Sequence, residues 1–167
     1  MAYVAPEKRP GRRPRKGKAA CLFCEMAAKR PAGKNLILAV TPLALVMMNL
    51  YPYNVGHVMV APRRHLASPE GMNPEEAVEV TSWLGRVIGA IKREYRPHGF
   101  NLGVNLGRVA GAGIVGHLHW HIVPRWNGDT NFMPVLADTK VLPEPIGRTY
   151  QRLRRALDGP APRRRAR

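Results

Sequence analysis

The segment HLHWHIVP, residues 117–124, places three histidines at every second position. Successive side chains of a β-strand point to opposite faces, so an extended chain would carry these imidazoles on one face. The residues between them are large and apolar, which allows the other face to be buried against a helix. The row therefore predicts a chemical site on one face of a strand. Its histidines are His117, His119 and His121, and the intervening residues are Leu118, Trp120 and Ile122.

Two kinds of chemistry could use this row. Neutral imidazole is a common metal ligand, but neighbours on one strand face stand roughly 6.6 Å apart, which is wide for chelation by three ligands. Imidazole can also attack phosphorus as a nucleophile and form a covalent intermediate. Other imidazoles then hold the phosphate oxygens and assist the leaving group. The spacing favours phosphate chemistry, with metal binding as the alternative.

A glycine-rich loop, GRVAGAGIVG at residues 107–116, directly precedes the row. Backbone N–H groups that no side chain covers bind anions, which supports phosphate binding there; a flexible turn between strands is the alternative. Within the loop, GAGIVG matches the dinucleotide-binding pattern G-x-G-x-x-G, but that pattern must open a helix. Here it leads into a strand-like segment that ends at Pro124, so a Rossmann fold is excluded.

The pair Cys21 and Cys24, in CLFC, supplies half of the four ligands that a structural zinc site needs. The chain has no other cysteine, so further ligands would come from His57, His65 or the histidine row through folding. A thiol pair without metal is the alternative. Two cysteines and no secretory signal also predict a cytoplasmic protein.

The helices and strands that position these residues are predicted from the spacing of apolar residues and from the Pro, Gly and Asn residues that start or end them. The long helix is predicted over 73–95, with Asn73 as N-cap and Pro74 at the first helical position. Apolar residues recur along it at helical spacing. Strands that neighbour one another around one long helix favour an α+β fold with an antiparallel sheet. The other predicted elements are strands at 36–40, 43–48, 57–62 and 100–105, the histidine row itself, and short helices within 22–29 and at 147–157.

The net charge of +16 is concentrated at the two ends of the chain. Residues 1–20 carry seven Lys/Arg and one Glu, and residues 159–167 carry four Arg. We expect two basic, disordered tails around a single domain at 21–158. The tails act either as solubilising segments or as sites of non-specific attraction to nucleic acid. No apolar run approaches the about 20 residues that span a bilayer, so no membrane segment is expected.

The chain resembles the histidine triad (HIT) superfamily over roughly residues 21–145. HLHWHIV matches the family motif of alternating histidines and apolar residues at every position. Asn49 lies eight residues before His57, as the ribose-binding Asn or Asp of the family does. The run PRWNGDTNFMPV at 124–135 is similar to the branch that contains diadenosine tetraphosphate phosphorylases. The resemblance implies a HIT-like α+β fold, with an antiparallel sheet of about five strands, one long helix and one or two short ones.

The resemblance also implies a role for each matching residue. His119 would be the nucleophile, oriented by the backbone carbonyl of His117. The chain departs from the family pattern at Gly113 and Ile114, where many relatives carry Gln followed by Ser or Thr. Without these polar side chains, the leaving oxygen lacks a side-chain donor, which favours the phosphorylase branch. The other implied contacts are His57 and His121 to phosphate oxygens, Asn49 to the ribose hydroxyls, Asn105 and the backbone around Gly113 to phosphate, and Trp126 near the far side of the nucleotide.

The family further implies a cofactor, an assembly and a reaction. In some members a structural zinc is held by residues that correspond to Cys21, Cys24, His65 and His117, and no organic cofactor is expected. Family members are typically homodimers. The expected reaction is phosphorolysis of diadenosine tetraphosphate to ATP and ADP through a nucleotidyl-histidine intermediate. The alternatives are a HIT hydrolase or nucleoside phosphoramidase that uses water, and a nucleic-acid-binding protein that acts through its charge.

Overall fold

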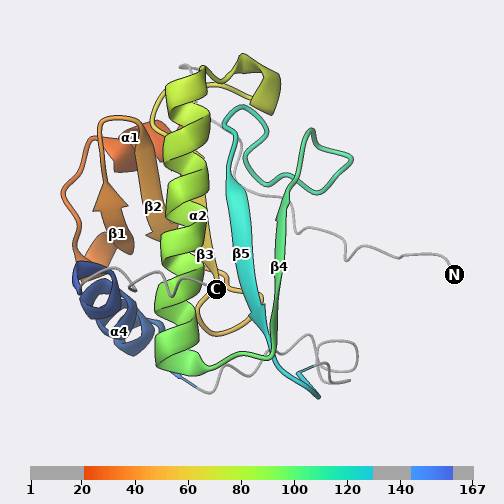
Figure 1. Ribbon diagram of the computed structural model, residues 1–167. Helices are drawn as coiled ribbons and strands as arrows, with labels where there is room; N and C mark the ends of the chain where they lie inside the picture. Colours follow the sequence, from red (N-terminus) through yellow and green to blue (C-terminus); the bar gives the residue numbers. More distant parts are fainter. Residues whose placement is uncertain (1–20, 130–143, 160–167) are drawn as a thin grey trace, which may run out of the picture.

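The computed structural model describes residues 21–129 and 144–159. These residues form one five-stranded antiparallel sheet in the order β1-β2-β3-β5-β4 (Figure 1). The predicted α+β class with an antiparallel sheet is confirmed. The strands are β1 (Ile37–Val40), β2 (Ala44–Met48), β3 (Val58–Pro62), β4 (Gly99–Val104) and β5 (Trp120–Arg125), and the helices are α1 (Leu22–Ala27), α2 (Pro74–Tyr95) and α4 (Ile146–Asp158). Two short 3-10 turns lie at Gly33–Asn35 and Pro69–Gly71.

Helix α2 begins where the sequence predicts. The Asn73 side chain accepts a hydrogen bond from the Glu76 backbone N–H at 2.8 Å, and the Glu76 carboxylate accepts one from the Asn73 N–H at 3.0 Å. This reciprocal pair satisfies two N–H groups that a helix start leaves without partners. The helix ends at Tyr95, and the C-cap residue Arg96 adopts the left-handed conformation with φ 46°. Local capping chemistry therefore fixes the length of the element that covers the sheet.

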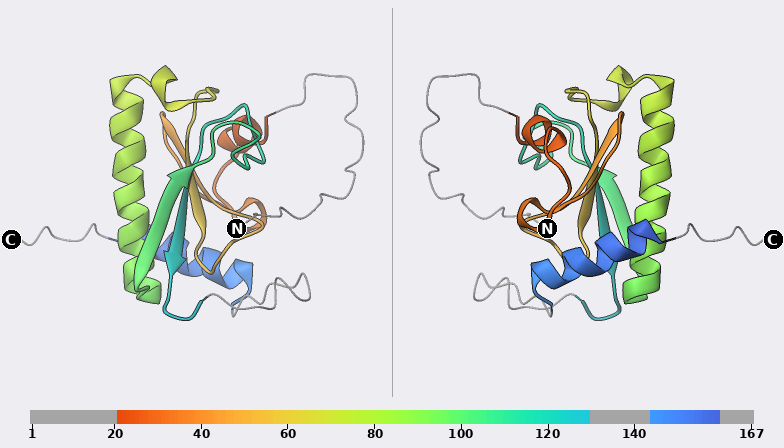
Figure 2. Two further views of the ribbon diagram at one scale, coloured as in Figure 1. Left: turned by 90° about the vertical axis from the view of Figure 1, so that its right-hand side faces the viewer. Right: turned by 90° about the vertical axis from the view of Figure 1, so that its left-hand side faces the viewer.

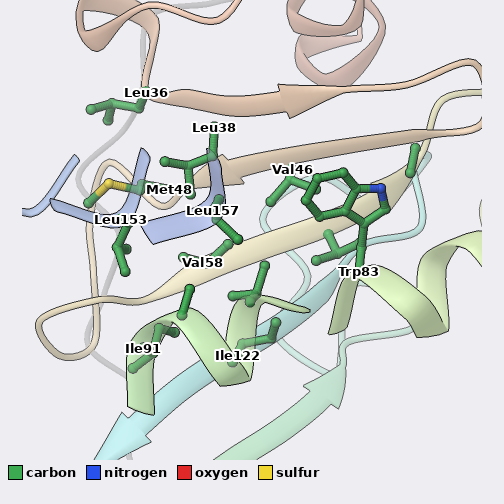
Figure 3. Packing of buried hydrophobic residues seen from close by; sticks show 14 of the residues in the cluster. Leu36, Leu38, Val46, Met48, Val58, Trp83, Ile91, Ile122, Leu153 and Leu157 are labelled. Atoms are coloured by element: carbon green, nitrogen blue, oxygen red, sulfur yellow. The ribbon is translucent and has the colours of Figure 1, made fainter. Parts of the chain in front are cut away.

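The two faces of the sheet are covered differently. Figure 2 shows α2 on one side of the sheet and α1 on the other. The α2 face carries the larger core, to which α4 also contributes. Figure 3 shows Trp83 and Ile91 of α2 and Leu153 and Leu157 of α4 meeting side chains of the strands, among them Val46, Val58 and Ile122. The opposite face has a smaller core formed by Phe23 and Ala27 of α1 with residues of the first three strands. The histidine site lies on this thinly covered face.

The fifth strand begins later than the sequence predicts. Val60 pairs with Trp120, so continued pairing would bring Leu118 opposite Pro62. Proline has no N–H to donate to the ladder, and β3 ends at this residue. His117 to His119 are consequently outside the strand, and the Leu118 N–H donates instead to the Leu66 carbonyl at 2.7 Å. The prediction of a strand over the whole histidine row is wrong for its first half.

The predicted tails, 1–20 and 159–167, lie outside the described residues except for Gly159, which follows α4. The domain limits at 21 and 158 therefore stay a prediction. Within the described residues, none of the helices combines the length and the apolar character needed to cross a membrane.

Candidate active site

The alternation along the histidine row survives although only its second half is a strand. Leu118 and Ile122 are buried, and Trp120 packs partly buried against the α2-side core. The imidazoles lie on the opposite side, where the rings of His119 and His121 meet edge to face with centroids 5.0 Å apart. The structure thus brings the three histidines to the face that the sequence predicts.

His119 is held in one tautomer by its neighbour. Its Nδ1 lies 2.7 Å from the carbonyl oxygen of His117. Because a carbonyl can only accept, Nδ1 carries the hydrogen and Nε2 carries the lone pair. The side chain is 94% covered, with 6% relative exposure, and burial lowers the pKa of His119 below its ordinary value. A neutral ring with an unprotonated Nε2 is the form of imidazole that can attack phosphorus.

His121 is held in the opposite sense through His57. The Tyr53 backbone N–H donates to Nδ1 of His57 at 3.0 Å, so the hydrogen of that ring is on Nε2. His57 Nε2 then donates to Nδ1 of His121 at 2.9 Å. The remaining hydrogen of His121 is therefore on its Nε2, which makes this atom a donor. Burial, with a smaller contribution from the charge of His119, lowers the pKa of His121 to about 4.

These two tautomers give complementary groups to adjacent rings, whose centroids are 5.0 Å apart. His119 offers a lone pair, and His121 offers an N–H beside it. A phosphorus atom attacked by the first would have an oxygen within reach of the second, where developing negative charge is stabilised. His57, which is fully buried, holds His121 in this orientation by donating to its Nδ1. Tyr53 stacks on His57 with ring centroids 4.9 Å apart.

His117 faces a different group of residues. Its Nε2 donates to the Pro62 carbonyl at 2.8 Å, so its lone pair is on Nδ1. That atom lies 3.2 Å from the Cys21 Sγ and 3.6 Å from the Cys24 Sγ. The Cys24 Sγ is also 3.4 Å from Nδ1 of His65. The structure therefore joins Cys21, Cys24, His65 and His117, the four residues that the resemblance implies, within 4.8 Å of one another.

The donor set fits a tetrahedral zinc ion. Zinc bonds of about 2.3 Å to sulfur and 2.0–2.1 Å to nitrogen place tetrahedral ligand atoms roughly 3.3–3.8 Å apart. Three of the six separations in this cluster, 3.2, 3.4 and 3.6 Å, are close to that range, and all six are within 4.8 Å. A ligating histidine usually donates its other N–H to a carbonyl or carboxylate, as His117 does to Pro62. A metal here would stabilise α1 against the sheet and hold His117, without touching the atoms of His119 and His121.

The remaining predicted residues are distributed around the row. Asn49 follows β2 and its backbone N–H donates to the His57 carbonyl at 3.1 Å, so it borders the histidines. Asn105 follows β4, and its Nδ2 would lie 3.7 Å from a Cβ added at Gly111. A Cβ added at Gly113 would meet nothing within 4 Å, which leaves the backbone of the loop approachable.

Trp126 lies at the other end of β5. It lines a hollow of about 460 Å³ together with Asn54, Val55, Tyr95, Glu144 and Arg152. About 23 Å of extended chain separates it from His119. No histidine lines the hollow that Trp126 borders. Two residues that contact the histidines were not predicted from the sequence. The backbone N–H and the ring of Tyr53 contact His57. Phe23, which packs on His119, lies between the two cysteines at a position that the motif does not constrain.

The antiparallel sheet and the histidine row are typical of histidine triad proteins, and comparison with known proteins agrees with this class. Residues 32–128 match the HIT domain family. The chain belongs to this family. A solved structure of a Zn-bound histidine triad family protein from Mycobacterium smegmatis superimposes with a TM-score of 0.65 at 25% identity, covering 84% of this chain and 95% of that one.

Two curated relatives carry different activities in their names. An AP-4-A phosphorylase of Mycobacterium tuberculosis is 43% identical over 111 residues, covering 66% of this chain and 57% of that protein. An adenosine 5'-monophosphoramidase of Schizosaccharomyces pombe is 32% identical over 108 residues, covering 64% of this chain and 75% of that protein. The first match therefore extends over little more than half of the relative.

Proposed function

We propose that this protein is a nucleotidyltransferase that cleaves diadenosine tetraphosphate by phosphorolysis. Nε2 of His119 attacks the phosphorus next to one adenosine, and the bond from that phosphorus to its bridging oxygen breaks. ATP leaves, and AMP stays bonded to the imidazole. Inorganic phosphate then attacks the same phosphorus, releases the imidazole and forms ADP. Splitting the transfer in this way replaces one difficult step with two easier ones.

The observation that supports this proposal is the pairing of tautomers, with a lone pair on Nε2 of His119 beside an N–H of His121. Phosphorolysis rather than hydrolysis is supported by the 43% identity to an AP-4-A phosphorylase and by Gly113 and Ile114, which offer no side-chain donor before the row. In this proposal His57 and His121 contact phosphate oxygens, Asn49 contacts the ribose, and Asn105 and the backbone at Gly113 contact phosphate. Trp126 would reach a nucleotide only from a second protomer.

The products formed with and without phosphate test the reaction. With labelled inorganic phosphate, we expect ATP and ADP in equal amounts and the label in the terminal position of ADP. Without phosphate, we expect little turnover, because the intermediate has no acceptor. If AMP is released at the same rate in both conditions, water is the acceptor, and the chain is a HIT hydrolase. Turnover of adenosine phosphoramidate in preference to diadenosine tetraphosphate would favour the phosphoramidase alternative.

We infer that Cys21, Cys24, His65 and His117 hold a structural zinc. The cluster geometry supports this, and so does the Zn-bound relative from Mycobacterium smegmatis. The ion would hold α1 on the sheet and keep both thiols deprotonated, whereas without metal burial raises the pKa of Cys24. In this proposal the ion does not contact the substrate and takes no direct part in the transfer.

We also propose that the protein is a homodimer that joins its β4 edges. Among the described residues, β4 has a partner strand on only one side, and Leu102 on it is 47% exposed. A hollow of about 370 Å³ lies between the first half of α2 and Trp120, which pairs with Val104 of β4. An uncovered apolar edge strand favours pairing with another chain. Sedimentation should give about twice 18.6 kDa for the wild type, and a smaller mass for Leu102→Lys. A wild type that sediments as a monomer at micromolar concentration would contradict the proposal.

A further inference from the structure

Phe23 lies between the two halves of the site. It occupies the interior of the cysteine pair in α1 and is 1% exposed. Its ring centroid is 5.1 Å from that of His117 and 4.7 Å from that of His119, with interplanar angles of 38° and 32°. One side chain therefore contacts both the imidazole that faces the thiols and the imidazole that carries the reactive lone pair.

The nucleophilic ring needs more than one restraint. The hydrogen bond from Nδ1 of His119 to the His117 carbonyl fixes one atom of the imidazole, and the ring can still rotate about that contact. His121 meets it edge to face on one side. Phe23 is the aromatic ring packed on it from α1. Together these contacts fix the direction of the Nε2 lone pair, which must point at phosphorus for attack.

The position of Phe23 depends in turn on the cysteines beside it. α1 has only six residues, and Cys21 at its N-cap makes no side-chain capping hydrogen bond. A helix this short is not stable by itself in water. Its attachment consists of the burial of Phe23 and Ala27 and the approach of Cys21 and Cys24 to His117 and His65. Whatever joins the four ligands also sets where the Phe23 ring lies.

We propose that Phe23 is a positioning residue for His119, and that it makes the orientation of the nucleophile depend on zinc in the neighbouring site. The metal does not enter the reaction. It fixes α1, α1 places the Phe23 ring, and the ring holds the imidazole that His117 already anchors through its carbonyl. This inference rests on the proposed nucleotidyl transfer, because it assigns Phe23 a part in presenting that nucleophile.

The test compares Phe23→Leu and Phe23→Ala with Leu22→Ala, a control on the same helix whose side chain is 41% exposed. Zinc content, kcat and KM for diadenosine tetraphosphate, and the mobility of the His119 ring from carbon-13 NMR relaxation of the imidazoles are measured for each. Phe23→Leu should keep zinc and fold, lose on the order of tenfold in kcat with little change in KM, and show a more mobile His119 ring; Phe23→Ala should lose up to about 100-fold in kcat. Leu22→Ala should match the wild type.

Removing zinc from the wild type with a chelator should increase the mobility of the His119 ring in the same way, and adding zinc back should restore the rigid ring. A Phe23→Leu protein with wild-type kcat and an equally rigid His119 ring would overturn the positioning role. A His119 ring whose mobility is unchanged by zinc removal would overturn the dependence on the metal. The NMR readout needs no substrate, so it decides both points even if the wild type fails to turn over diadenosine tetraphosphate, which would contradict the proposed function alone.

Discussion

His119→Ala is expected to lower the rate of nucleotidyl transfer by about 10³- to 10⁶-fold, the range typical of removing a covalent nucleophile. The substitution deletes the lone pair that the proposed mechanism assigns to the attack, whereas His57 and His121 are engaged with each other through a hydrogen bond of 2.9 Å. The measurement is single-turnover formation of ATP from diadenosine tetraphosphate, together with mass spectrometry of the protein for the AMP adduct. The adduct should be absent from the variant.

The matched control is His98→Ala. His98 is the one histidine outside both clusters, and its Nδ1 accepts a hydrogen bond from the Asn127 N–H at 2.9 Å in a surface turn. We expect turnover within about twofold of the wild type, because a surface substitution away from the core and the site usually has a small effect on stability. Near-normal turnover by His119→Ala, with the fold intact by circular dichroism, would remove His119 from the role of nucleophile.

In the proposed mechanism, the protonation of His119 and His121 determines the pH dependence of the wild type. Attack requires His119 to be neutral, and burial lowers its pKa below 6.5. A lowered pKa means that, as the pH falls from 7 to 6.5, the His119 ring stays neutral to a greater extent than an ordinary histidine and gains its proton in more acidic solution. His121, with its pKa lowered to about 4, also stays neutral over this interval. The rate of ATP release should therefore begin to fall at a lower pH than an ordinary histidine would give, and a fall centred at or above pH 6.5 would contradict this expectation.

Removal of zinc is expected to produce the second large effect, a loss of stability. A ligand present at 100 to 1,000 times its dissociation constant stabilises the folded state by about 2.7–4.1 kcal/mol. For a chain of this size, each kcal/mol shifts Tm by roughly 2–4 °C, so a chelator should lower Tm by roughly 10 °C. Differential scanning fluorimetry with and without the chelator, followed by addition of zinc, measures this shift.

A double variant, Cys21→Ser with Cys24→Ser, is the control for the chelator. It should already have the lower Tm and should not respond to chelation, because serine does not replace a thiolate as a zinc ligand. Protein purified without chelator should carry about one zinc per chain. Less than about a tenth of an equivalent, or a chelator effect that persists in the double variant, would contradict the assignment of the site.

The sequence predicted those features that depend on neighbours close along the chain. The alternation of Leu118 and Ile122 with the histidines places the imidazoles on one face, because side chains alternate in any extended segment. The Asn73 cap and Pro74 fix the start of α2 through contacts within its first turn. The contact of the His117 carbonyl with His119, which the family motif implies, is present in the structure.

Only the tertiary structure decided how the histidine row is divided. His117 turns its Nδ1 to the cysteines because the Pro62 carbonyl takes its other nitrogen, and His121 becomes a donor because Tyr53 fixes His57. Each of these partners is 55 to 68 residues from the imidazole that it finally controls. Spacing along a strand specifies the face of a side chain, but its tautomer depends on hydrogen bonds between segments that folding alone brings together. The placement of Phe23 on two imidazoles and of Trp126 at the far end of β5 follows from the same long-range packing.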